Sequence, residues 1–439
     1  MLLYLIAYLL LLVIGLLIIN LLDTENTLTL LEKYAIGFIL GIAVNSFLLF
    51  IFGWAQISIG AVKYLDMILV LGVGFVNYRK RLWKRLIPLF QMPKFTKRDL
   101  ILIPFIVLIL FKTFFSLFNS VNVPSYFDDE KGNWNIKSKI IYHEGVINTQ
   151  SGTETYVGGG GHREYPLNFI LYKSYVADFM WEWNESYINL ITWTVFNLTI
   201  ILLIFSFSDR VFGSIVAYLI YSLPLIVWHS GAAYYDLIYA CFYLLSFIFF
   251  FRYIKKPERI HLFIIWILLY SVIFTKNEGM MLIAPSILAG IGFYLYREKS
   301  LKELMYVGIP MLFIIPHMIF RAIHHLSFNP HSASAAYWFH SDSLGLYYTY
   351  FTQWGGYNIF WYILPLFIIF FLKDLLKKKY LWIAISLAAL AGIIFLIFSF
   401  TNNYQFLLDQ TTINRTLLSF MTGCIYLGSL LCQEKIYSK

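Results

Sequence analysis

The sequence predicts an all-α integral membrane protein with about 13 transmembrane helices. Of its 439 residues, 60% are hydrophobic, 20% are aromatic and only 13% are charged, and the mean hydropathy is +0.71. Water-soluble domains carry roughly 25% charged residues, so this composition excludes an ordinary soluble fold. Apolar runs of roughly 17–22 residues recur along the chain, and each is long enough to cross about 30 Å of hydrocarbon as a helix.

The predicted spans follow one another along the whole chain, separated by polar segments. They are 1–22, 34–54, 62–78, 100–118, 186–208, 212–229, 236–252, 261–275, 279–296, 304–320, 356–373, 381–400 and 415–432. The first span has neither a basic leading segment nor a small-residue cleavage site, so we expect it to be retained rather than removed as a signal peptide. All three cysteines fall within spans, which predicts neither a disulfide framework nor a cysteine metal site.

The formal net charge of +9 is explained by topology rather than by nucleic-acid binding. If 13 spans alternate sides, most Lys and Arg residues fall in one set of loops, including the basic run 79–98 and the segment 252–259. The positive-inside rule assigns these loops to the cytoplasm. We therefore expect a multi-pass protein of the cell membrane with a cytoplasmic C-terminus, in contact with membrane lipids and with no nucleic acid.

Two units are predicted along the chain. Residues 1–99 form accessory N-terminal helices and a basic cytoplasmic segment, and residues 100–439 form the main transmembrane domain. Within that domain, the outer loops 119–185 and 321–355 are longer than compact connections usually are, and long loops are commonly functional. We therefore expect the functional residues to lie in these loops and at the outer ends of the spans.

The first outer loop is expected to contain three segments. Residues Glu130 to His143 can form a helix, with Asp128 or Asp129 as its N-cap. Its apolar residues are expected to rest on the bilayer, namely Trp134, Ile136, Ile140 and Ile141. The glycine-rich stretch 149–161 is expected to be mobile. The apolar run 165–183 is expected to lie on the outer face, with Trp181 and Trp183 at headgroup depth. Counting it as a crossing would place the basic segment 252–259 outside the cell, against the positive-inside rule.

Ionisable residues gather at the predicted outer ends of the spans, where they can line one cavity. They are Asp128, Asp129, Glu130, Lys137, Lys139, His162, Asp236, Lys276, Glu278, Arg321, His324, His325 and Arg415. A lipid phosphate that leaves during a reaction needs cations beside it. A hydroxyl acceptor needs a carboxylate to take its proton. A membrane-embedded transferase acting on a lipid-linked substrate requires this combination.

Ordinary structural roles compete with these assignments. The three consecutive acids can simply favour the positive end of a helix dipole, and so can Asp236. The lysines Lys137 and Lys139 can anchor the chain at the headgroups. The segment 276–279 has the composition of a tight turn. Neighbouring histidines such as His324 and His325 point apart on a helix, which disfavours a shared metal ion.

The spacing of these residues resembles that of the GT-C superfamily of glycosyltransferases. The pattern is Asp129-x4-Trp134-x2-Lys137-x-Lys139, His162-x2-Tyr165-Pro166-Leu167, Asp236, and Thr275-Lys276-Asn277-Glu278-Gly279. It is most similar to the bacterial branch akin to protein O-mannosyltransferases and the lipid A aminoarabinose transferase, and it covers roughly residues 100 to 430. The resemblance implies a GT-C-like catalytic domain, with surface-lying helices in its first outer loop, that uses a polyprenyl-phosphate sugar at the outer membrane face.

Carried over residue by residue, the resemblance implies a set of roles. Asp129 matches the catalytic aspartate and Glu130 the acid after it, while Asp128 adds a carboxylate and leaves open which of the two aspartates is the base. Asp236 matches a second acidic position, Lys276 a basic residue that binds phosphate, and Arg415 an arginine before the last span. Two features depart from the relatives: a single Tyr165-Pro166 replaces two prolines, and no large C-terminal outer domain follows. These departures leave the acceptor open.

The expected function is transfer of a monosaccharide, a hexose or a pentose, from a polyprenyl-phosphate carrier to a lipid, glycan or protein acceptor, by direct displacement at the extracytoplasmic face. The candidate catalytic residues are Asp129, Asp128 and Asp236. The candidate substrate-binding residues are Glu130, Lys137, Lys139, His162, Tyr165, Lys276, Glu278, Arg321 and Arg415. The sequence identifies no cofactor with certainty, and Mg or Mn held by Asp128, Asp129 and Asp236 is the candidate. A transporter or flippase of lipid-linked saccharides and a ligase of whole glycans are the competing functions.

Overall fold

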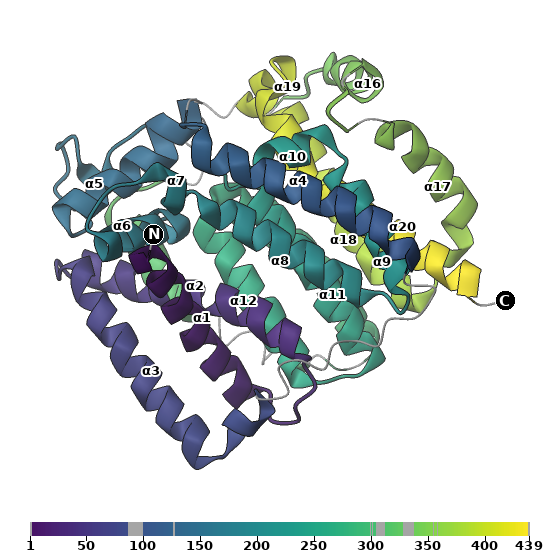
Figure 1. The fold of residues 1–439 in the computed structure, drawn as a ribbon. Coiled ribbons are helices and arrows are strands. Elements are labelled where there is room, and N and C mark those ends of the chain that lie inside the picture. The colour runs from purple at the N-terminus through teal and green to yellow at the C-terminus, as the bar shows by residue number, and fades with distance from the viewer. Residues whose placement is uncertain are drawn as a thin grey trace.

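The computed structural model describes residues 2–86, 100–125, 128–298, 300, 302–303, 312–327, 338–353, 355–357 and 359–437, and within these ranges the chain is helical with no strand (Figure 1). The helices are α1 Leu2–Leu22, α2 Leu30–Trp54, α3 Val62–Arg79, α4 Leu102–Asn122, α5 Ile136–Glu144, α6 Asn168–Met180, α7 Glu185–Ile188, α8 Leu190–Ser206, α9 Arg210–Tyr221, α10 Pro224–Ser230, α11 Asp236–Lys255, α12 Arg259–Thr275, α13 Ala284–Arg297, α15 Ile315–Ile323, α16 Ser343–Gln353, α17 Phe360–Leu375, α18 Lys378–Phe400, α19 Gln405–Leu408 and α20 Thr411–Tyr437. The π-helical turns η4 Glu130–Asn135 and η6 Gly279–Ile283 precede α5 and α13. An all-α, multi-pass membrane protein is confirmed.

Nine helical segments of the described chain are long and apolar enough to cross a membrane. They correspond to nine of the predicted spans. Of the other four, three match shorter or broken helices: 212–229 is split into α9 and α10 with a bend of 83°, 261–275 is the 17-residue α12, and 356–373 is the 16-residue α17. The predicted span 304–320 falls partly on residues outside the described ranges. The count of 13 crossings stays a prediction.

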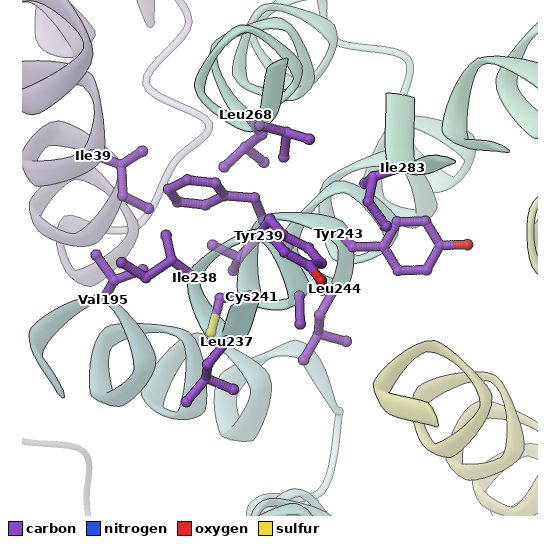
Figure 2. Close-up of a cluster of buried hydrophobic side chains, with 14 of the residues drawn as sticks. Ile39, Val195, Leu237, Ile238, Tyr239, Cys241, Tyr243, Leu244, Leu268 and Ile283 are labelled. Carbon is purple, nitrogen blue, oxygen red and sulfur yellow. The ribbon is translucent and has the colours of Figure 1, made fainter. Parts of the chain in front are cut away.

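Helix α11 lies at the centre of the molecule, packed against α8, α12 and α20. It is apolar all around, as expected of a helix surrounded by other helices. Figure 2 shows Ile39 of α2, Val195 of α8 and Leu268 of α12 beside side chains of α11. The N-terminal helices therefore share one hydrophobic core with the rest of the chain. The predicted boundary at residue 99 divides the sequence but does not separate two hydrophobic cores.

Helices α1 and α2 cross at a row of small residues. Gly15 of α1 faces Gly37 of α2, and Gly41 of α2 faces the backbone of Leu11, so closely that an added Cβ at Gly15 or Gly41 would collide with a carbonyl oxygen. Small residues at such crossings let two membrane helices approach and pack their backbones directly. Helix α2 in turn packs against α6, α8 and α12.

Gly41→Ala is expected to destabilise the protein by about 1–3 kcal/mol, because the methyl group forces the two backbones apart. The measurement is the thermal unfolding midpoint of the purified protein in detergent. Gly72→Ala is the matched control, since a Cβ at Gly72 of α3 meets no atom within 4 Å. Equal midpoints for the two variants would contradict the packing argument.

One end of the helices is rich in basic residues, several of which pair with acids of neighbouring helices. At one end, Arg252 of α11 pairs with Glu32 of α2, and Lys379 of α18 lies 2.8 Å from Glu434 of α20. The beginnings of α11 and α20 and the end of α12 meet at the other end. The assignment of the basic end to the cytoplasm stays a prediction.

The first outer loop corrects two expectations. The helix predicted from Glu130 to His143 is present, but the side chain of Asp129 makes no capping hydrogen bond, and its carboxylate contacts a distant helix instead. Trp134 and Ile141 were expected to rest on the bilayer and are instead buried within the protein, where they join the main hydrophobic core. Hydropathy indicates that a side chain avoids water and does not distinguish lipid from protein.

The run predicted to lie on the outer face contains α6, whose 13 residues are too short for a crossing. Nearly all of its side chains are buried against α1, α2, α5 and α12, so protein rather than lipid surrounds it. Trp181, just beyond its end, is 79% exposed, and Trp183 is half-buried. The glycine-rich stretch before it folds back onto the loop helix, with the amide of Gly161 donating to the carbonyl of Gly132 at 2.9 Å.

Candidate active site

Four charged residues from four distant parts of the chain meet at one end of the helices. Arg415 Nη1 lies 2.6 Å from Asp129 Oδ2 and 3.9 Å from Asp236 Oδ2. Lys276 Nζ lies 2.8 Å from Asp236 Oδ1. We call Asp129, Asp236, Lys276 and Arg415 the charged cluster. The structure thus brings together the residues that the sequence placed at the outer ends of different spans.

Local structure positions each member of the charged cluster. Asp236 is the first residue of α11 and Lys276 follows the last residue of α12, so antiparallel packing of these helices places them side by side. An acid in the first turn is also favoured by the positive end of the helix dipole. Arg415 lies near the start of α20, which packs against α11. Asp129 lies directly before η4.

Tyrosine side chains surround the charged cluster. The hydroxyl of Tyr239 donates to Asp236 Oδ1 at 3.1 Å. The Lys276 ammonium lies 5.8 Å from the ring centre of Tyr165 and 5.9 Å from that of Tyr239, and the Arg415 guanidinium lies 5.1 Å from that of Tyr234. Cations over aromatic faces gain electrostatic stabilisation, which is stronger away from water.

The four side chains of the charged cluster differ in solvent exposure. The side chains of Asp236 and Lys276 are 1% and 3% exposed, whereas those of Arg415 and Asp129 are 17% and 32% exposed. Burial disfavours the charge on Lys276, but the carboxylates of Asp236 and Glu278 outweigh it and raise the pKa of Lys276. Lys276 is therefore a cation at neutral pH, and solvent reaches the cluster at Asp129.

The acids next to these residues have separate surroundings. Asp128 is exposed, whereas Glu130 is buried and its Oε1 accepts the backbone amide of Ala233 at 2.7 Å. Glu130 thereby ties the first outer loop to the turn that precedes α11. Glu278 Oε1 lies 3.1 Å from Lys276 Nζ. Of the two candidate bases, Asp129 is the aspartate that enters the charged cluster.

Other predicted substrate-binding residues support the loops around the cluster. The Lys137 ammonium is buried and donates to the carbonyl of His162, and burial lowers the pKa of Lys137 to about 7. His162 Nδ1 lies 3.1 Å from Glu164 Oε1. Lys139 is exposed on α5. The contacts of Lys137 are thus within the protein rather than with the charged cluster.

Arg321 also connects two loops beside the charged cluster. Its Nη1 donates to the carbonyl of Glu164 at 2.6 Å and to Asn277 Oδ1 at 3.0 Å. It therefore joins the loop that carries Tyr165 to the turn that carries Lys276. A buried arginine with several donors in a fixed fork suits this bridging position.

Sequence reasoning included Tyr165 but missed Tyr234, Tyr239 and His229. His229 is fully buried, neither ring nitrogen has a hydrogen-bond partner among the described residues, and its ring lies 5.4 Å from that of Tyr234. His229 was not predicted because residues 212–229 were interpreted as one continuous span. Pro224 within that run was the available signal, because proline commonly breaks a helix.

The donor set was tested against a divalent metal ion. Within the described part of the chain, no three His, Cys, Asp or Glu residues are grouped to hold a metal. Moreover, Arg415 Nη1 occupies the position between the carboxylates of Asp129 and Asp236 that a bridging cation would take. Both carboxylates therefore already face a cation of the chain, and the residues as arranged do not fit Mg or Mn.

Comparison of the chain with protein-family models, with curated proteins and with solved structures found no match.

Proposed function

We propose that the chain is a membrane glycosyltransferase that moves a monosaccharide from a polyprenyl-phosphate carrier to a hydroxyl-bearing acceptor. The observation that supports this most strongly is the charged cluster itself, in which an accessible carboxylate and two cations from separate helices lie within ion-pair distance. Such a reaction needs a proton acceptor for the incoming hydroxyl and cations for the departing phosphate.

The charge balance of the site indicates how the donor phosphate binds. The cations of Lys276 and Arg415 face the carboxylates of Asp129, Asp236 and Glu278. A phosphate therefore binds favourably by displacing a carboxylate from a cation. Asp129 is the one free to move, because it is 32% exposed while Asp236 is 1% exposed. Arg415 then holds the phosphate, and the carboxylate of Asp129 is released as a base.

The reaction follows as a single displacement. The acceptor oxygen forms a bond to the anomeric carbon while the bond between that carbon and the phosphate oxygen breaks. The bonding electrons leave with the phosphate, whose charge Lys276 and Arg415 stabilise, and the hydroxyl proton passes to Asp129. Asp236 keeps Lys276 charged and in position through their 2.8 Å contact. Attack opposite the leaving phosphate inverts the configuration.

The proposed orientation places the charged cluster at the extracytoplasmic face. The loops at the opposite end carry most of the basic residues, which marks that end as cytoplasmic in a cell membrane. The C-terminus, which follows α20 at the basic end, is then cytoplasmic.

Arg415→Gln tests the proposed phosphate contact. In reconstituted vesicles supplied with polyprenyl-phosphate monosaccharides, we expect the KM for the donor to rise roughly 10–150-fold, the range for a lost hydrogen bond to a charged group. Arg163→Gln is the matched control, since Arg163 lies in the first outer loop and faces the ring of Tyr156 instead of the charged cluster. The same vesicles separate the alternatives: transfer only from long glycan carriers indicates a ligase, and movement of the carrier across the bilayer without transfer indicates a flippase.

A further inference from the structure

A cavity of about 550 Å³ lies between α4 and α10, beside the charged cluster. Its lining includes Lys112 and Phe115 of α4, Asn189 before α8, Ser222 and Pro224 at the start of α10, and Glu130. We call it the α4–α10 cavity. Because Glu130 directly follows Asp129, the cavity reaches the loop that carries the proposed base.

The α4–α10 cavity exists because a helix is broken inside the predicted membrane layer. Helix α9 has 12 residues, which is about 18 Å of rise and too short to cross the hydrocarbon. The chain then bends by 83° into α10. Irregular backbone at membrane depth is tolerated where it is buried in protein or lines a polar cavity. Ser222 and Pro224, at this bend, line the cavity.

Two polar groups face the α4–α10 cavity without the partners that such groups need. Lys112 lies at the midpoint of the 21-residue α4, and no carboxylate of the described chain lies within ion-pair distance of it. Asn189 is 8% exposed, and its Oδ1 accepts no hydrogen bond from the described residues. Ionisable residues within membrane spans commonly mark substrate pathways. The cavity thus contains a cation without a carboxylate partner and, in its wall, a buried oxygen that lacks a donor.

An apolar groove adjoins the α4–α10 cavity on the membrane-facing side of α4. It has a volume of about 570 Å³ and is lined by Phe111, Phe114, Phe115, Leu117, Phe118, Val121 and Asn122. Phe115 lines both spaces. Phe111, Phe114 and Phe118 are 68%, 63% and 60% exposed. A cavity that contains a cation and adjoins an apolar groove at Phe115 matches an amphiphile with an anionic headgroup.

We propose that the α4–α10 cavity is the acceptor site and that the acceptor is an anionic membrane lipid with a hydroxylated headgroup. The lipid enters from the bilayer along α4, its anionic group pairs with Lys112, a headgroup hydroxyl donates to Asn189 Oδ1, and a second hydroxyl reaches Asp129. This inference rests on the proposed function, in which the donor phosphate binds Lys276 and Arg415 and leaves the α4–α10 cavity to the acceptor. The two substrates then approach residues 129–130 from different sides, as direct displacement requires.

The binding test does not depend on sugar transfer. The full-length protein in nanodiscs is labelled with phosphatidylglycerol that carries a photoreactive group on its headgroup, and labelled peptides are mapped by mass spectrometry. Labelling is expected on α4 and α10, with displacement by phosphatidylglycerol but not by phosphatidylcholine or soluble glycerol 3-phosphate. Lys112→Gln is expected to reduce labelling by about tenfold, as loss of a charge-assisted contact does, whereas Lys112→Arg retains it. Lys373→Gln, on the exposed surface of α17, is the matched control for loss of charge.

Each outcome decides between the two proposals. Labelling that is insensitive to Lys112→Gln, or displaced by polyprenyl phosphate and not by phosphatidylglycerol, overturns the acceptor site. Labelling as expected without any transfer by the wild-type protein retains the lipid site and overturns the proposed transferase. Where transfer occurs, Lys112→Gln is expected to raise the KM for the lipid and leave the KM for the donor unchanged.

Discussion

Asp129→Asn is expected to lower sugar transfer by about 10²–10⁴-fold, the usual contribution of a positioned general base. The amide keeps the shape of the carboxylate and can still accept a hydrogen bond from Arg415, but it cannot take up the acceptor proton. The loss should therefore be in kcat, and the KM for the donor should not rise, because the neutral amide competes less than the carboxylate for Arg415. Transfer from a labelled polyprenyl-phosphate sugar in reconstituted vesicles measures both constants.

Asp128→Asn is the matched control for this prediction. The two aspartates are neighbours in sequence, yet Asp128 is exposed while Asp129 lies 2.6 Å from Arg415. The Asp128 variant is expected to retain a rate near that of the wild type. A large loss with Asp128→Asn and none with Asp129→Asn would assign the base to the other aspartate. Full activity in both variants would remove the carboxylate base from the mechanism altogether.

The meeting of these residues at one end of the molecule could be predicted from sequence because spans alternate in direction. Once Asp236 is placed at the start of one span and Lys276 at the end of the next, antiparallel packing brings them to the same level. The same reasoning placed Asp129 and Arg415 at that end, although 286 positions separate them. The long apolar helices were equally predictable, because the length of an apolar run is set by the thickness of the bilayer.

The contacts within that end could not be predicted from the pattern. Local propensity favoured Asp128 or Asp129 as a helix cap, but the carboxylate of Asp129 forms a long-range ion pair with Arg415 instead. Lys137 resembled a ligand for phosphate, yet its ammonium bonds to the carbonyl of His162. The break between α9 and α10 was missed because mean hydropathy over a window is insensitive to a bend, so His229 and the cavity beside Lys112 remained hidden.

Breaking the buried pair of Asp236 and Lys276 is expected to have the second large effect. The partners are 1% and 3% exposed, so Asp236→Asn leaves the buried Lys276 only Glu278 as a counter-charge, and Lys276→Met leaves the buried Asp236 only Arg415, at 3.9 Å. Such a change typically destabilises a protein by about 3–5 kcal/mol. The unfolding midpoint of each variant in detergent measures this loss. Lys63→Met is the control, because the pair of Lys63 and Asp178 is 17% and 27% exposed and breaking it should cost about 0–1 kcal/mol.

The double variant Asp236→Asn with Lys276→Met separates structure from catalysis. Replacing both members of a buried pair is often neutral, because no unpaired charge remains, so the unfolding midpoint is expected to recover much of the single-variant loss. Sugar transfer should not recover, since the cation proposed to stabilise the leaving phosphate is absent. Recovery of both stability and transfer would mean that the pair only holds α11 against α12. Arg415 would then bind the phosphate without Lys276, and it would be the only cation that stabilises the leaving phosphate in the proposed displacement.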